Sequence, residues 1–297
     1  PLNYAIVKEQ LITKIPSFLE DMHKTVGLKD YSYIPFPRAT KQIAVFISNS
    51  EKRNVMITGP AGSGKTALVE GIVQRICKND PILPKNLLTK RFYKVSCVSL
   101  MSGTSYRGTL EEKIHEILKF TKSQKNSEIV FEEIHQVSIA NKNSIGSNNV
   151  SVLDFFKEDL ARSGISIIGM TTREEFALHL NDQTLQRRFN AITLKLPSFK
   201  DSLEMLKERT KGLLETHPSI TVAEDTYEEV LTLASKLSDQ NSSLIDQGYN
   251  LLQTAFTAIA LDENRIGKIC IDKKEMENIC REYFTMKPGT FVDERLD

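Results

Sequence analysis

The sequence has few cysteines, and their arrangement suggests neither a metal site nor a disulfide framework. The four thiols, Cys77, Cys97, Cys270 and Cys280, form no C-x-x-C pair, so ordinary reduced cysteines are predicted. Also missing are a recognisable signal peptide and any uninterrupted apolar run of the roughly 18 to 20 residues that a membrane span needs. We therefore expect a cytoplasmic protein with no membrane span.

Strongly basic or acidic character is absent as well. Lys and Arg total 39 and Asp and Glu total 38, a net charge of +1, so no overall field attracts the chain to nucleic acid or to a membrane surface. Of the 297 residues, 40% are hydrophobic and 26% are charged, which is typical of a globular protein with room for one large and one smaller domain. Nucleic acid is therefore not an expected partner.

Residues 59–66 carry the most informative pattern in the chain. They fill every fixed position of the phosphate-binding pattern G-x-x-x-x-G-K-[ST]. Glycines let backbone N–H groups converge on phosphates, the lysine places an ammonium on the β/γ-phosphates, and the threonine hydroxyl is a ligand for Mg²⁺. The predicted nucleotide-binding residues are Gly59, Pro60, Ala61, Gly62, Ser63, Gly64, Lys65 and Thr66.

The segments on either side of this loop agree with it. Residues 54–58 are a short apolar run suited to a buried parallel strand, and residues 67–73 have helical spacing. A strand, loop and helix in this order put the phosphates at a helix N-terminus, where the dipole favours anions. The alternative is a chance match in a glycine-rich surface loop. The context favours binding of a nucleoside triphosphate, which we take to be ATP with Mg²⁺.

Strands and helices alternate over much of the chain, which predicts an α/β fold: a parallel sheet with helices on both faces. The expected strands are 55–58, 92–98, 129–131, 165–170 and 191–196, and the expected helices between or before them are 39–48, 67–77, 110–121 and 152–162. Farther on, only helices are expected, at 200–216, 223–236, 244–260 and 273–283, apart from a possible short strand at 268–271.

This change of pattern predicts the domain organisation. Residues 1–30 are a helical or irregular lead-in, 31–197 an α/β nucleotide-binding core, and 198–285 a small helical lid. The asparagine- and serine-rich stretch 141–151 is expected to be a loop.

An ATPase also needs a carboxylate on the metal side and a group that activates water. The apolar run 129–131 leads directly into Glu132 and Glu133. Glu133 is the candidate base for the attacking water, and Glu132 the residue that orients Mg²⁺. The neighbouring His135 is expected to pack or to orient rather than to bind a ligand. Two glutamates that merely end a strand at the surface are the alternative.

Two further patterns are weaker when each is taken alone. Thr171 ends the next expected strand, where its hydroxyl can hold the γ-phosphate or the attacking water. Arg187 and Arg188 precede another expected strand. An arginine at a subunit boundary can neutralise transition-state charge on a neighbour's phosphate, whereas an exposed salt-bridging pair is the alternative.

In their order along the chain, these motifs resemble the first ATPase module of Clp-type AAA+ unfoldases, the ring-forming ATPases of the ClpA, ClpB and ClpC types. The similarity extends from about Phe36 to the C-terminus. The motifs that carry it are 59–66, 106–112, 131–135, 169–172, 185–189 and the lid-helix segment 245–252.

The resemblance implies how the nucleotide and the substrate are held. It implies that residues from both domains surround the base and the phosphates, namely Pro35, Phe36, Leu203, Leu206 and Asp246. It also implies that Tyr106 lies on a central pore loop and grips a translocating polypeptide. The following Arg107-Gly108 is expected to form an exposed tight turn.

The resemblance implies partners as well. Arg187 and Arg188 would be arginine fingers that reach the next subunit of a ring, with a hexamer as the expected size. Polypeptides are the expected substrates, and an adaptor or a partner protease stays open. Residues 286–297 resemble a linker toward a second ATPase module, so the chain is expected to be a piece of a longer protein.

Three positions depart from the family pattern. Ser105 stands where a basic pore-loop residue is usual, Glu132 replaces the usual Asp, and Gln247 replaces a lid lysine. All three favour an alternative function, a module that binds ATP to assemble a ring but hydrolyses it poorly. A nucleic-acid-handling AAA+ protein is a third possibility, which the neutral charge balance disfavours.

Overall fold

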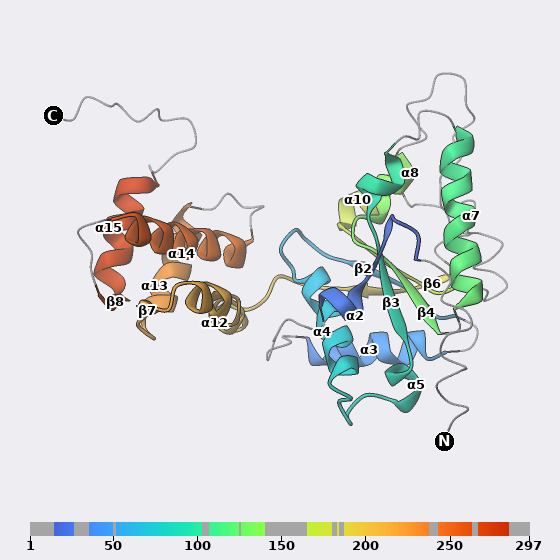
Figure 1. The fold of residues 1–297 in the computed structure, drawn as a ribbon, viewed down its shortest axis with the longest axis horizontal. Helices are drawn as coiled ribbons and strands as arrows, with labels where there is room; N and C mark the ends of the chain where they lie inside the picture. The colour runs from blue at the N-terminus through green and yellow to red at the C-terminus, as the bar shows by residue number, and fades with distance from the viewer. Residues whose placement is uncertain are drawn as a thin grey trace. The chain divides into compact units, whose positions relative to one another are not determined.

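The structure is a computed structural model. It describes residues 15–26, 36–49, 52–102, 107–124, 126–139, 165–179, 183, 187–237, 243–262 and 267–284. The chain forms two compact units: the first contains Phe36–Gly59 and Lys65–Leu194, and the second contains Pro60–Gly64 and the chain from Lys195 (Figure 1). Several predicted features lie outside the described residues: Pro35, Ser105, Tyr106, the loop at 141–151, the helix at 152–162 and the linker at 286–297.

The first unit is built on a sheet that has six strands within the described residues, in the order β1-β3-β4-β5-β2-β6 (Figure 1). The five strands β3-β4-β5-β2-β6 run parallel to one another, and β1 pairs antiparallel with β3 at the edge of the sheet. The predicted α/β fold with a parallel sheet is therefore confirmed. The strands are β1 Leu19–Asp21, β2 Asn54–Thr58, β3 Arg91–Val95, β4 Ser127–Phe131, β5 Ile167–Thr171 and β6 Phe189–Thr193.

The central strands are buried along their whole length. Every residue of β2, β4 and β5 is buried, as expected for strands covered on both faces. In the register of the sheet, Thr58 at the end of β2 lies beside Thr171 at the end of β5 and Thr193 at the end of β6. The carboxyl ends of these strands therefore meet at one edge, which is where open α/β sheets bind ligands.

Helices cover both faces of this sheet. Figure 1 shows α7 on one face and α3 and α4 on the other, as expected because the crossovers after β2 and after β3 run in opposite directions along the sheet. The helices of this unit are α2 Met22–Thr25, α3 Pro37–Ile47, α4 Lys65–Cys77, α5 Lys85–Leu88, α6 Cys97–Met101, α7 Arg107–Ser123, α8 Ile134–Ile139 and α10 Arg173–His179.

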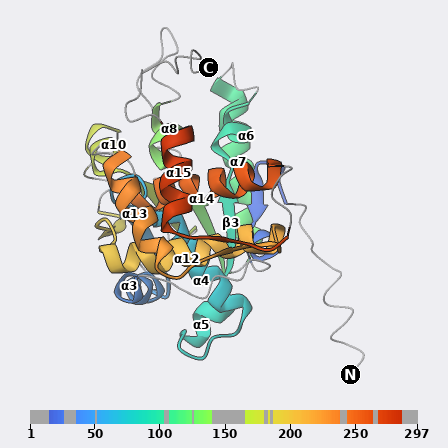
Figure 2. The same cartoon turned by 90° about the vertical axis from the view of Figure 1, so that its left-hand side faces the viewer.

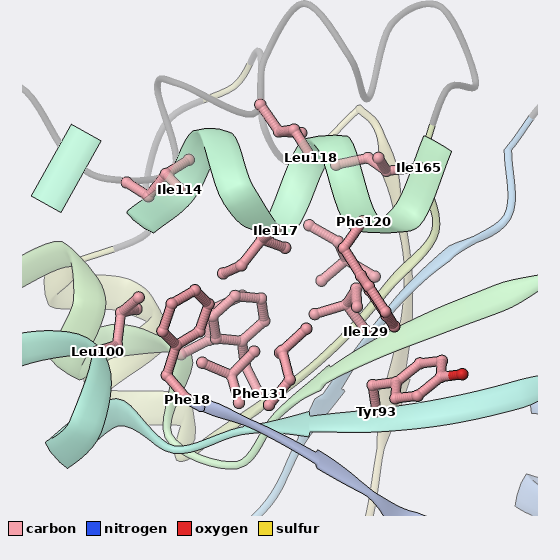
Figure 3. Packing of buried hydrophobic residues seen from close by; sticks show 14 of the residues in the cluster. Phe18, Tyr93, Leu100, Ile114, Ile117, Leu118, Phe120, Ile129, Phe131 and Ile165 are labelled. Carbon is pink, nitrogen blue, oxygen red and sulfur yellow. The ribbon is translucent and has the colours of Figure 1, made fainter. Parts of the chain in front are cut away.

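One hydrophobic cluster fixes α7 on β3 and β4 (Figure 3). Ile117 and Phe120 of α7 point toward Ile129 and Phe131 of β4. The ring of Phe120 meets Tyr93 of β3 edge-on, with 4.9 Å between the ring centroids. Such edge-to-face pairs add stability beyond the area they bury. This packing holds β4, and with it the segment that follows β4, in one position.

The second unit is mainly helical (Figures 1 and 2). Its apolar core contains Leu206, Leu231, Leu252 and Phe256, all fully buried. Serine or aspartate side chains cap the first residues of three helices by accepting backbone N–H groups. The elements are α12 Phe199–Thr216, β7 Ile220–Val222, α13 Thr226–Leu237, α14 Leu244–Leu261, β8 Ile269–Ile271 and α15 Lys273–Tyr283, and β7 pairs parallel with β8.

Three local predictions were wrong. The lead-in contains a strand, since Leu19 belongs to β1 and its backbone pairs with β3. The strand predicted over 92–98 ends at Val95, because the Ser96 hydroxyl accepts the N–H of Ser99 and so begins α6. Arg107 and Gly108 form the first residues of α7 instead of an exposed tight turn.

Among the described helices, none has both the length and the apolar character needed to cross a membrane. The described residues also contain no group of three or more histidine, cysteine, aspartate or glutamate side chains placed to hold a metal ion.

Candidate nucleotide site

The phosphate-loop pattern lies where β2 ends and α4 begins. Gly62 and Gly64 have φ values of 68° and 82°, in the left-handed region that glycine adopts without strain. The backbone N–H of Gly59 donates to the carbonyl of Thr171 at 3.3 Å, which ties the first loop residue to β5. The loop is thus a tight turn, fixed to the centre of the sheet, that ends at a helix N-terminus.

Lys65 is the first residue of α4 and is 9% exposed. Its Nζ donates to the carbonyl oxygen of Gly59 at 2.9 Å, so the ammonium lies against the loop. Burial lowers the pKa of Lys65, while the negative charges of Glu133 and Glu174 oppose this shift. The acidic neighbours therefore help to keep the lysine charged in a largely buried position.

The two carboxylates after β4 have different surroundings. Burial raises the pKa of Glu133, and the nearby His135 and Lys65 oppose this rise. Glu132 instead lies 3.6 Å from Nζ of Lys94 on β3, measured at its Oε2. One carboxylate therefore has the raised basicity that suits a proton acceptor, whereas the other is engaged in an ion pair.

Thr171 is fully buried at the end of β5. Its Oγ1 lies 2.9 Å from Nδ1 of His135, and the same nitrogen lies 3.4 Å from Oε2 of Glu133. A chain of polar contacts thus joins the ends of β4 and β5. The candidate base and the candidate hydroxyl, 38 positions apart in sequence, are both within reach of one imidazole.

The structure adds three residues to this cluster that the sequence reasoning missed. The charge of Glu174 acts to raise the pKa of Lys65, and Oε2 of Glu175 lies 4.0 Å from Nε2 of His135. Burial, followed by the charges of Glu132 and Glu133, raises the pKa of Cys97 to about 11. A signal for the two α10 glutamates was present: Thr172 with Glu175 three residues later matches the capping box, and the Glu175 N–H donates to the Thr172 hydroxyl at 3.1 Å.

Arg187 and Arg188 lie in the turn before β6; Arg187 is exposed and Arg188 is partly buried. The side chain of Asn54 donates to the carbonyl of Arg188 at 3.2 Å and accepts the N–H of Ile167 at 2.9 Å. Because β2 and β6 are parallel, this turn lies beside the start of β2. The phosphate loop follows the end of β2, roughly 15 Å farther along the sheet.

The other described residues that were predicted to contact the nucleotide make contacts within their own unit. Phe36 precedes α3, and its carbonyl accepts the N–H of Thr40 at 2.9 Å. Within the second unit, Leu206 is fully buried and Leu203 packs against the same apolar core. Asp246 forms an ion pair with Arg209. Whether these residues contact the base or the phosphates stays a prediction.

The fold and this cluster together define a class. A phosphate loop between the parallel strand β2 and a helix, a hydroxyl at the end of the adjacent strand β5, and acidic residues after β4, the next strand along, form the arrangement of P-loop ATPases. The model of the family "ATPase family associated with various cellular activities (AAA)" matches residues 55–195. Residues 55–195 therefore form a domain of this family, and the predicted Clp-type AAA+ family, fold and ATPase class are confirmed.

Known proteins similar to this chain agree with that assignment. This chain is 32% identical over 238 residues to the ATP-dependent Clp protease ATP-binding subunit ClpL of Staphylococcus aureus. The alignment covers 80% of this chain and 33% of the relative. The chain therefore spans about a third of the length of the ClpL relatives that it matches.

Solved structures share the fold at lower sequence identity. A closed-state reconstruction of Hsp104 with ATPγS and FITC casein has a TM-score of 0.74 and 23% identity, over 89% of this chain and 44% of that one. The Hsp104–ADP complex of S. cerevisiae has a TM-score of 0.73 and 22% identity, over 91% of this chain and 45% of that one.

Proposed function

We propose that the chain is the ATP-hydrolysing module of a ring-forming protein unfoldase. The observation that carries the proposal is the convergence of Lys65, Glu133 and Thr171 at the carboxyl ends of β2, β4 and β5. A cation for the phosphates, a carboxylate of raised basicity and a hydroxyl that can orient water are groups that support transfer of a phosphoryl group to water. The similarity to Clp ATP-binding subunits extends the proposal to protein remodelling.

The loop residues fit a bound triphosphate. The Ser63 hydroxyl is buried and has no hydrogen-bond partner among the described residues, so a phosphate oxygen would satisfy it. Lys65 would exchange the carbonyl of Gly59 for phosphate oxygens, which bind an ammonium more strongly because they are charged. The loop N–H groups would hold the remaining phosphate charge.

The oxygen donors near this loop also fit a hard divalent cation. Thr66 follows Lys65 and is exposed, so its hydroxyl is accessible as a ligand, and Glu132 would orient the water shell of the ion. When bound, Mg²⁺ would neutralise charge on the β- and γ-phosphate oxygens.

Glu133 would accept a proton from the attacking water. Its raised pKa makes the ionised carboxylate a stronger base than an ordinary glutamate. Thr171 would hold the γ-phosphate or the water through its hydroxyl, which lies in the same chain of contacts. Thr171 ends β5, and Glu133 lies in the two-residue turn between β4 and α8, so the sheet positions both side chains.

Arg187 and Arg188 would act on the nucleotide of a neighbouring subunit. They lie beside the start of β2, whereas the phosphate loop of the same chain follows the end of that strand. An arginine side chain spans only about half of that separation, so the pair is poorly placed for its own site. This supports a ring, for which we propose six subunits as in the family.

Polypeptide substrates are part of the proposal. The Hsp104 structures that share this fold include complexes with casein. Tyr106, which lies outside the described residues, would grip the polypeptide by apolar contact, independently of its sequence. We include a partner protease or an adaptor in the proposal, because the similar ClpL is an ATP-binding subunit of an ATP-dependent Clp protease.

One observation favours the alternative of a ring scaffold that hydrolyses ATP poorly. Lys94 lies 3.6 Å from Glu132 and also 3.6 Å from Glu20. An ammonium at this position competes with Mg²⁺ for the Glu132 carboxylate. A scaffold would bind ATP tightly and release almost no phosphate.

The variant Tyr106→Ala tests the unfoldase proposal in the full-length protein. We expect phosphate release within about twofold of the parent and loss of unfolding of a fluorescent substrate, because the tyrosine touches polypeptide and not ATP. Tyr283→Ala, at an exposed tyrosine of α15, is the matched control and should keep both activities. Unfolding at the parental rate by Tyr106→Ala would contradict the motor function, and negligible phosphate release by the parent would favour the scaffold.

A further inference from the structure

We propose that His135 is a positioning residue for hydrolysis, whose Nδ1–H group is shared between the Thr171 hydroxyl and the Glu133 carboxylate and so orients both. The role rests on the ATP hydrolysis proposed above. It deepens that function by naming a side chain that contacts neither phosphate nor water but sets the direction of the two groups that would.

The position of His135 allows this role. It is the second residue of α8, directly after the segment that carries Glu133, and α8 lies against β5 and α10. Its Nδ1 is 2.9 Å from Thr171 Oγ1 and 3.4 Å from Glu133 Oε2, and its side chain is 13% exposed. The imidazole therefore bridges the ends of β4 and β5.

The chemistry of the neighbours determines which atom must carry the hydrogen. An ionised carboxylate only accepts hydrogen bonds, whereas a hydroxyl both donates and accepts. A hydrogen on Nδ1 suits both Glu133 and Thr171. It also leaves the Thr171 hydrogen available for a phosphate oxygen or for water. A lone pair on Nδ1 would face the carboxylate and would take up the Thr171 hydrogen.

The two contacts are unequal, and they share one hydrogen. The 2.9 Å contact to Thr171 has the length of an ordinary hydrogen bond, while the 3.4 Å contact to Glu133 is longer than an ordinary N–H···O bond and is an electrostatic contact. Movement of the Glu133 carboxylate toward Nδ1 would draw the hydrogen from Thr171, and movement away would return it. The orientations of the base and of the hydroxyl are thereby coupled.

The far side of the ring faces a second carboxylate. Nε2 of His135 lies 4.0 Å from Oε2 of Glu175. The backbone N–H of Glu175 donates to the Thr172 hydroxyl at 3.1 Å, which caps the start of α10. At 4.0 Å the contact is too long for a hydrogen bond, so the direction of Nδ1 depends on its contacts with Thr171 and Glu133.

Two substitutions distinguish the role of Nδ1 from that of Nε2. The amide of His135→Asn occupies the position of Nδ1 and keeps a donor there, whereas the amide of His135→Gln reaches the position of Nε2. In the full-length protein we expect His135→Gln to lower the turnover number for ATP by about ten- to hundredfold with KM within about twofold. His135→Asn should retain most of the turnover. His115→Gln, at an exposed position of α7, is the control.

Equal losses in the Asn and Gln variants, or parental turnover in His135→Gln, would overturn the role, because a packing function does not distinguish the two amides. Nitrogen NMR of the nucleotide-free protein with labelled histidine provides a test that needs no hydrolysis. A hydrogen on Nδ1 of His135, with a resonance that shifts in Thr171→Val, is the expected result. An Nδ1 without hydrogen would overturn the proposal. A parent that releases no phosphate would contradict the proposed function alone, since the NMR result still decides the role of His135.

Discussion

The Nζ atom of Lys65 donates to the carbonyl oxygen of Gly59 at 2.9 Å, so the phosphate loop is closed by its own lysine. The N–H of the same glycine donates to Thr171 on β5. Gly59 therefore connects the lysine to the strand end that carries the buried hydroxyl. This internal acceptor satisfies a buried ammonium until phosphate oxygens replace it.

Replacement of the lysine tests the binding step. Lys65→Ala should weaken ATP binding by about a hundredfold or more, because backbone N–H groups alone leave the β/γ charge poorly neutralised. Calorimetric titration with a non-hydrolysable ATP analogue measures the affinity. Lys119→Ala, at an exposed position of α7, is the control. Parental affinity in the Lys65 variant would show that nucleotide binds elsewhere.

The turn that carries Arg187 and Arg188 leads to a prediction about the assembly of subunits. Arg188→Ala should lower the turnover number by about a thousandfold or more with unchanged ATP affinity, because an arginine finger acts on transition-state charge. Parental turnover should rise with protein concentration as rings form. Arg281→Ala, at an exposed arginine of α15, should behave as the parent. Full activity in a strictly monomeric sample would contradict an action between subunits.

Asn54 is predicted to stabilise the sheet and the turn that carries Arg188. Its buried side chain joins β2 to Ile167 and to Arg188. Asn54→Ala removes both contacts and should cost about 1–3 kcal/mol in the free energy of unfolding. Asn86→Ala, at an exposed position of α5, should change it by less than about 0.5 kcal/mol. Urea denaturation followed by circular dichroism gives both values, and equal stability of the two variants would contradict this role.

The raised pKa of Glu133 predicts how stability depends on pH. When the folded-state pKa of a carboxyl lies above its unfolded value, the folded state binds more protons between the two pKa values, so stability is lost as pH rises through that window. The variant Glu133→Gln has no charge to bury. It should therefore melt at a higher temperature than the parent at pH 8, with the difference shrinking as the pH falls below the ordinary glutamate value. A lower melting temperature for the variant at pH 8 would contradict burial as the cause of the shift.

The phosphate loop and the acidic residues after β4 could be predicted because their chemistry requires particular residues at short, fixed spacings. The contacts of His135 could not, because they depend on β4 and β5 being neighbours in the sheet. The Lys94–Glu132 ion pair likewise depends on the pairing of β3 with β4. Residues that are close only through sheet order leave no local pattern in the sequence.

Short edge elements were the other source of error. Leu19–Asp21 has three residues and no alternating pattern that would mark it as a strand; it forms because the edge of β3 offers hydrogen-bond partners. The strand at Ile220–Val222 was also missed because three residues are too few to show an alternating pattern, although its partner near residue 270 was expected. The domain boundaries near residues 30, 197 and 285 stay predictions.

Hydrolysis by Glu133 is the central claim, and retention of ATP in Glu133→Gln tests it most directly. Radiolabelled ATP is bound to the full-length protein with Mg²⁺, and the nucleotide that stays bound is identified with time. We expect the parent to accumulate ADP and release phosphate, and the variant to bind ATP with similar affinity and keep it intact, because only the proton acceptor is lost. Phosphate release by Glu133→Gln at the parental rate, or a loss of affinity as large as that of Lys65→Ala, would contradict the account.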